Sequence, residues 1–137
     1  MYLDTAILVK LLVREPDSRF YAELVEGEVV WSSQIVVTEC FSALRRKERE
    51  RGITPSHRHR AWRQVEADIA ARRLNLVTLT ADVLARANGI LGACHHRAAL
   101  ARCPPPERCQ SWPIYSNDRR VRQAATRLGL PLAPTPR

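Results

Sequence analysis

Residues 1–12 read Met1-Tyr2-Leu3-Asp4-Thr5-Ala6-Ile7-Leu8-Val9-Lys10-Leu11-Leu12, and this stretch decides the expected fold. An apolar start that closes on an acid predicts a short buried strand that ends at Asp4. Thr5 can cap the helix that follows, because its hydroxyl accepts from an amide of the first turn, and this helix is expected to run to Leu12. A strand followed at once by a helix is the building unit of α/β proteins.

The same alternation continues along the rest of the chain. Further strands are predicted at 28–31, 74–79 and 114–116, with 130–132 as a candidate edge strand. Helices are predicted from 16 or 17 to Gly27, from a cap at Ser32 or Ser33 to Gly52, at 56–73, from 81 after a cap at Thr80, and at 118–128. This order predicts an α/β fold, a three-layer α/β/α sandwich with a central, mostly parallel sheet of four to five strands, in which 1–137 form a single domain.

The composition predicts a globular chain with a polyanionic partner. Hydrophobic residues make up 45% of the 137 residues and charged residues 26%, and no apolar run approaches the ~18 residues of a membrane span. The expected compartment is the cytoplasm, because no basic segment precedes the apolar residues 6–9 and no cleavage site follows them. The net charge of +8 favours nucleic acid as the partner, although a GC-rich genome also enriches a chain in arginine.

Three acids follow predicted strands. Asp4 closes the first strand, Asp118 follows the last, and Glu39 lies in the apolar early part of the helix after the second. Ligands of parallel α/β sheets bind beyond the carboxyl ends of the strands, so these carboxylates are expected to converge. Each acid also has a simpler interpretation. Asp4 and Asp118 are good helix caps, and Glu39 can pair with a surface arginine.

A divalent metal is the simplest partner for converging carboxylates. Mg²⁺ or Mn²⁺ takes oxygen ligands and keeps several of its waters. A metal held in this way activates a water and stabilises the charge that develops on a phosphate. The acids therefore predict a metal-dependent phosphodiesterase site.

The chain resembles PIN-domain proteins of the VapC toxin type over nearly its whole length. The resemblance is carried by the opening stretch at 2–16, by 38–46 with Glu39, and by Ser116-Asn117-Asp118 with the residues after it. It implies a ribonuclease toxin that depends on Mg²⁺ or Mn²⁺ and is usually a homodimer held inactive by a small antitoxin. It implies that Asp4, Glu39 and Asp118 are the catalytic residues and metal ligands, supported by Thr5, Ser116 and Asn117.

One position departs from the family pattern. The family usually carries Leu-Asp-Ala-Leu-His, whereas this chain has Leu91-Gly92-Ala93-Cys94-His95, so Gly92 stands where an acid is expected. Gly is also less favourable than Ala in a helix by about 1 kcal/mol. The expected function is therefore a ribonuclease of impaired activity. The alternative is a catalytically inactive PIN-like protein that binds antitoxin or RNA.

Two basic or unusual segments leave alternatives open. The segment 94–112 contains Pro104-Pro105-Pro106 and is not expected to be regular helix throughout. Its cysteines and histidines favour zinc chemically, but their spacing matches no zinc motif. The basic stretch 45–60 is expected to be exposed, either as a contact surface for RNA or antitoxin or as a solvated face.

Overall fold

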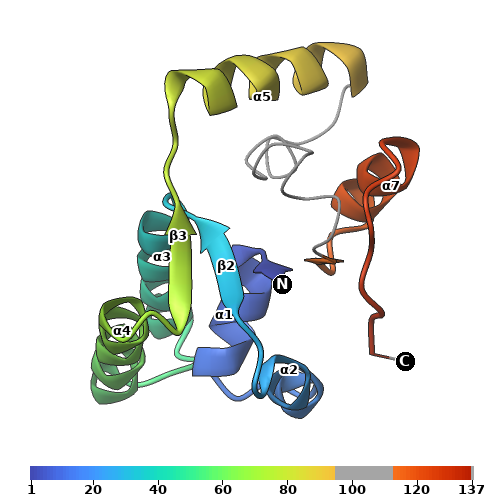
Figure 1. The fold of residues 1–137 in the computed structure, drawn as a ribbon. Helices are drawn as coiled ribbons and strands as arrows, with labels where there is room; N and C mark the ends of the chain where they lie inside the picture. The colour runs from blue at the N-terminus through green and yellow to red at the C-terminus, as the bar shows by residue number, and fades with distance from the viewer. Residues whose placement is uncertain (95–112, 137) are drawn as a thin grey trace.

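The computed structural model describes residues 1–94 and 113–136. Figure 1 shows the elements in chain order. They are β1 (Tyr2–Leu3), α1 (Thr5–Leu12), α2 (Ser18–Val25), β2 (Val30–Ser33), α3 (Val36–Arg49), α4 (Pro55–Ala70), β3 (Leu74–Val77), α5 (Ala81–Cys94), β4 (Ile114–Tyr115) and α7 (Arg119–Arg127).

The four strands form one parallel sheet in the order β3-β2-β1-β4. Tyr2 lies opposite both Trp31 of β2 and Ile114 of β4, so β1 is an inner strand with a neighbour on each side. The predicted α/β fold with a parallel sheet is confirmed. Leu132 pairs with Ile114 through a single parallel bridge only, so the candidate edge strand at 130–132 is reduced to one residue.

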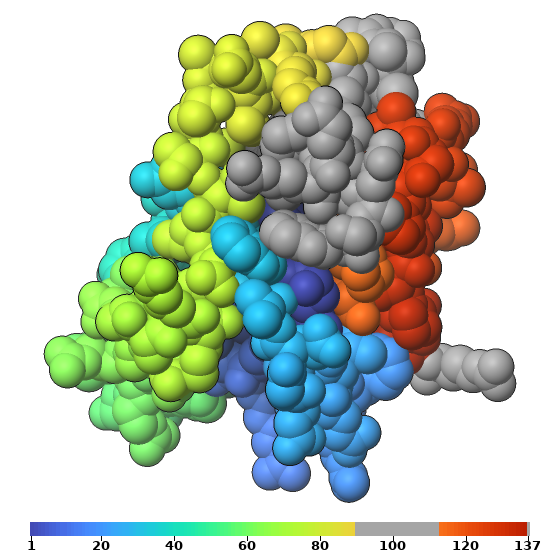
Figure 2. All heavy atoms as spheres, in the orientation of Figure 1, coloured from blue at the N-terminus to red at the C-terminus, as the bar shows by residue number. Residues whose placement is uncertain are grey.

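Most of the buried apolar residues of the described chain gather in three clusters. The largest joins β1, β2 and β3 to α1, α2 and α3 and includes Val36 and Cys40 of α3. Leu44, on the same face of α3, belongs to a small cluster with Val13, Ile53 and Ala61. The third cluster packs Val121, Ala124 and Ala125 of α7 against Ile114. Figure 2 shows α7 and α4 on opposite sides of the molecule. None of the helices in the described ranges is both long and apolar enough to span a membrane.

The expected cap of α3 is wrong, because Ser32 and Ser33 belong to β2. Both serines are 2% exposed, and the Ser32 hydroxyl donates to the carbonyl of Leu3 over 2.9 Å. The position that precedes α3 is Ile35, which makes no capping bond through its side chain. From sequence alone, a serine whose buried hydroxyl is hydrogen-bonded inside the sheet therefore cannot be distinguished from a serine that caps a helix.

Two helices end at an arginine in the left-handed conformation. Arg51 has φ 58° and Arg72 has φ 55°, at the position after the last helical turn where glycine is usual. The closing bond from the Gly52 amide to the Lys47 carbonyl, 2.9 Å, is the same as the bond from Leu130 to Ala125 at the end of α7. There the left-handed residue is Gly129. The sequence placed the helix stop at Gly52, one residue too late.

Arg51→Gly is expected to stabilise the protein by roughly 0.5–1 kcal/mol, because glycine adopts a positive φ without the steric cost of a Cβ. The measurement is the free energy of unfolding in urea. The matched control is Arg49→Gly, at the exposed last residue of α3, which is helical, so that glycine should lower the stability there. Equal losses in the two variants would show that Arg51 is not left-handed in solution.

Candidate active site

Asp4 ends β1 and caps α1. Its carboxylate Oδ1 accepts from the backbone amide of Ile7 over 2.9 Å, and its own backbone is extended. The prediction that Thr5 caps this helix is therefore wrong by one residue. Both side chains are good caps, and the strand pairing decides between them, because it leaves Asp4 as the extended residue before the first turn.

The Thr5 hydroxyl serves the second acid instead. Thr5 Oγ1 donates a short hydrogen bond to Glu39 Oε2, which joins the first turn of α1 to the first turn of α3. The two helices pack against each other along this line. Glu39 thus lies next to the residue that follows Asp4, although the two acids are far apart in the sequence.

The third acid lies at the carboxyl end of β4, the other neighbour of β1. Asp118 caps α7 and accepts from the amide of Arg120 over 2.8 Å. Its own amide donates to the hydroxyl of Ser116, which is 2% exposed. The simpler interpretation of Asp4 and Asp118 as helix caps is therefore correct as geometry, and each cap holds a carboxylate at the same edge of the sheet.

The ends of β1 and β4 lie side by side, since Leu3 pairs with Tyr115, and the acids that follow them act on each other. Burial raises the pKa of the Asp4 carboxyl above its ordinary value, and the negative charge of Asp118 raises it further. Hydrogen bonds from Ser116 and from the first amides of α1 oppose this shift in pKa. In the described part of the chain, no positive side chain is among the groups that shift it. The two acids are thus close enough to repel each other.

A family model described as PIN domain matches residues 1–135. The chain belongs to the PIN-domain family. PIN domains are in general nucleases that act on nucleic acid and typically bind Mg²⁺ or Mn²⁺. No curated protein matches the chain.

The acidic side chains of this PIN domain are of the chemical type that binds a hard divalent cation. Asp4 and Asp118 offer oxygen ligands and repel each other, so a divalent cation would lower their mutual energy. The third carboxylate, Glu39, is bonded to Thr5. Within the described ranges, no three acidic, histidine or cysteine side chains are grouped closely enough to hold a metal ion. The predicted role of the three acids as metal ligands therefore stays a prediction.

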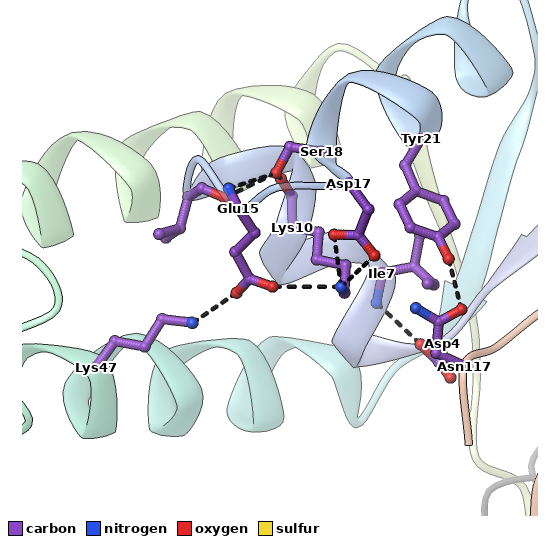
Figure 3. Close-up of polar contacts among 10 residues, drawn as sticks. Asp4, Ile7, Lys10, Glu15, Asp17, Ser18, Tyr21, Lys47 and Asn117 are labelled. Atoms are coloured by element: carbon purple, nitrogen blue, oxygen red, sulfur yellow. Dashed lines mark hydrogen bonds and ion pairs between the residues drawn. The ribbon is translucent and has the colours of Figure 1, made fainter. Parts of the chain in front are cut away.

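Two features near the PIN-domain acids have no local signature in the sequence. The Tyr21 hydroxyl donates to Asn117 Oδ1, so α2 holds the turn that carries Asp118 (Figure 3). Tyr21 is 1% exposed and could be found from sequence only as an apolar position of α2. Figure 3 also shows the Lys10 ammonium between the carboxylates of Asp17 and Glu15, at 2.6 and 3.3 Å.

The cysteine predictions divide between described and undescribed residues. Cys40 is buried, and burial raises the pKa of its thiol to about 12, so it stays neutral, as predicted for a small apolar side chain. Gly92 lies in α5, and the surroundings of its side-chain position are outside the described part of the structure. The candidate zinc ligands at 95–109 also lie outside the described residues.

Proposed function

We propose that this PIN domain is a metal-dependent endoribonuclease and the toxin of a toxin–antitoxin pair, with its activity weakened by Gly92. The observation that carries the proposal is the half-buried Asp4 carboxylate at the end of β1, close to Asp118 and without a positive partner among the described groups that act on it. A protein gains no stability from two repelling carboxylates, and a site that binds a cation explains them.

In such a site each of the named residues would have a separate role. Mg²⁺ or Mn²⁺, when bound by Asp4 and Asp118, would supply an activated water and a positive charge for the phosphate. Ser116 and Asn117 fix the turn that carries Asp118, since the Ser116 hydroxyl accepts from its amide. Thr5 orients the Glu39 carboxylate by its hydrogen bond. The net charge of +8 supports RNA as the substrate, because polyanions are attracted to such a chain.

A second candidate function is a catalytically inactive PIN-like protein that binds antitoxin or RNA. It is favoured by Gly92 at the expected acid position and by the lack of a three-ligand metal group among the described residues. A homodimer, a small antitoxin partner and a cytoplasmic location are part of both proposals and stay predictions, as does the single domain at 1–137.

The experiment is cleavage of a single-stranded RNA, with Mn²⁺, with Mg²⁺ and with EDTA. We expect slow cleavage with either metal and none with EDTA, together with a rise of the melting temperature on addition of Mn²⁺, since a ligand of the folded state stabilises it. No cleavage and no thermal shift would favour the inactive alternative. Slower growth of bacteria that produce the protein, relieved by a co-produced antitoxin, would test the toxin role.

A further inference from the structure

A groove of about 540 Å³ runs between α1 and α3 and begins at the candidate site. Thr5 and Glu39 line its first end, and the other end is lined by Lys10, Arg46 and Lys47 together with the acid Glu15. From α3 the lining residues are 39, 42, 43, 46 and 47, which share one helical face. Glu39 and Arg46 are seven residues apart on α3, so they lie about 10 Å apart along the helix axis.

The middle of the groove is made of small side chains. Ala6 comes from α1, and Ser42 and Ala43 come from α3. No aromatic residue lines it in the described part of the chain, so the groove offers no platform for stacked bases. Small residues instead let a sugar–phosphate backbone approach the helices closely, and the exposed Ser42 hydroxyl is a donor of the kind that binds phosphate oxygens.

The cations at the far end are not equivalent. Lys10 pairs with Asp17 and Glu15, and Lys47 pairs with Glu15 at 2.6 Å, so both ammonium groups are already neutralised. Arg46 is exposed, and no acidic side chain of the described residues pairs with it. Its guanidinium is therefore the available charge of this groove, and arginine matches the geometry of a phosphate.

We propose that the α1–α3 groove holds the backbone of a single RNA strand, with Arg46 on a phosphate about one and a half to two turns of α3 away from Glu39. The inference rests on the proposed ribonuclease function and adds the path of its substrate. The groove volume of about 540 Å³ suits a short stretch of one backbone and is too small for a duplex. Contacts of this kind fix the position of the strand and do not read its sequence.

The test is the affinity for a short fluorescent single-stranded RNA at several salt concentrations, in EDTA so that no cleavage occurs. Arg46→Ala should weaken binding several-fold and make the slope of log affinity against log salt shallower by about 0.7, the value of one phosphate contact with a single strand. Arg49→Ala is the matched control, because Arg49 is exposed on α3 and does not line the groove. Its slope should stay that of the wild type.

A second pair of variants tests the groove itself. Ser42→Glu, which puts a negative charge on its floor, should weaken binding at least about tenfold, whereas Ala67→Glu on the exposed side of α4 should change it little. Circular dichroism checks that all variants fold. An Arg46→Ala slope equal to that of Arg49→Ala, or a duplex RNA bound as tightly as the single strand, would overturn the inference.

The outcomes also separate this inference from the proposed function. Absence of cleavage combined with the Arg46 effect on binding would remove the ribonuclease proposal and support the groove. Cleavage that survives without an Arg46 effect would support the ribonuclease and overturn the groove. No RNA binding even at low salt would overturn the inference and leave this surface to a protein partner.

Discussion

Asp4→Asn is expected to abolish metal-dependent RNA cleavage, with a loss of at least about a hundredfold. The carboxylate of Asp4 lies at the end of β1 close to Asp118, and the proposed function assigns it to the cation, for which a neutral amide is a poor ligand. Asparagine caps a helix as well as aspartate, so the bond to the Ile7 amide is retained. The loss therefore reports the charge and not the fold.

The same change is expected to stabilise the protein in EDTA at neutral pH. Folding raises the pKa of the Asp4 carboxyl above its ordinary value of 3.8, so the folded state resists ionisation more than the unfolded state does. Below that ordinary value both states are protonated, and Asp4 carries no penalty. As the pH rises through the raised folded pKa, the wild type loses stability and Asp4→Asn does not, so the gap between their melting temperatures should widen.

The measurements are cleavage rates with Mn²⁺, and melting temperatures in EDTA from a pH below 3.8 up to neutral pH. Asp82→Asn, at an exposed acid of α5, is the control, and it should leave both quantities near those of the wild type. Cleavage by Asp4→Asn at the wild-type rate would remove Asp4 from the site. A gap in melting temperature that shrinks as the pH rises would contradict the raised pKa.

Gly92→Asp is expected to raise the cleavage rate on the order of a hundredfold. The change restores the acid that the family pattern places at this position, and a metal-bound water displaced by about an ångström loses rate by a factor of this size. The helix should accept it, because Asp is no worse than Gly in a helix interior. Asp4→Ala in the Gly92→Asp background should return the rate to the background of the assay.

The matched control is Gly89→Asp, one turn earlier in α5. A Cβ added at Gly89 meets no atom within 4 Å, so this variant adds the same charge to the same helix without strain. It should leave the rate unchanged. Robust cleavage by the wild type that Gly92→Asp does not increase would show that the register at 91–95 is wrong or that this acid is dispensable.

The parallel sheet could be predicted because its strands and helices alternate with clear local patterns. The acids at the strand ends could also be located, since Asp4 directly follows an apolar run and Asp118 follows another after Ser116 and Asn117. Finer features depended on contacts that no local pattern carries. Asp4 and Thr5 are both cap residues, and the pairing of β1 decides which one caps. Tyr21 contacts Asn117 across 96 positions of sequence, which periodicity in α2 does not reveal.

The predicted end of α3 is also wrong, because the residue with a positive φ there is not a glycine. A glycine near the end of a helix is the usual stop signal, so the sequence predicts that the helix ends at Gly52. In the structure the left-handed residue after this helix is Arg51, although arginine disfavours a positive φ. Sequence alone therefore places the end of a helix only within a residue or two.

The position of β1 between β2 and β4 also sets the order in which the candidate site forms during synthesis. A ribosome delivers Asp4 first and Asp118 last of the three acids, and a nascent chain folds from its amino end. Until β4 emerges, β1 has one neighbour and Asp4 has no second acid beside it. An unfinished chain therefore lacks the paired carboxylates, so the candidate site forms only after β4 has been synthesised.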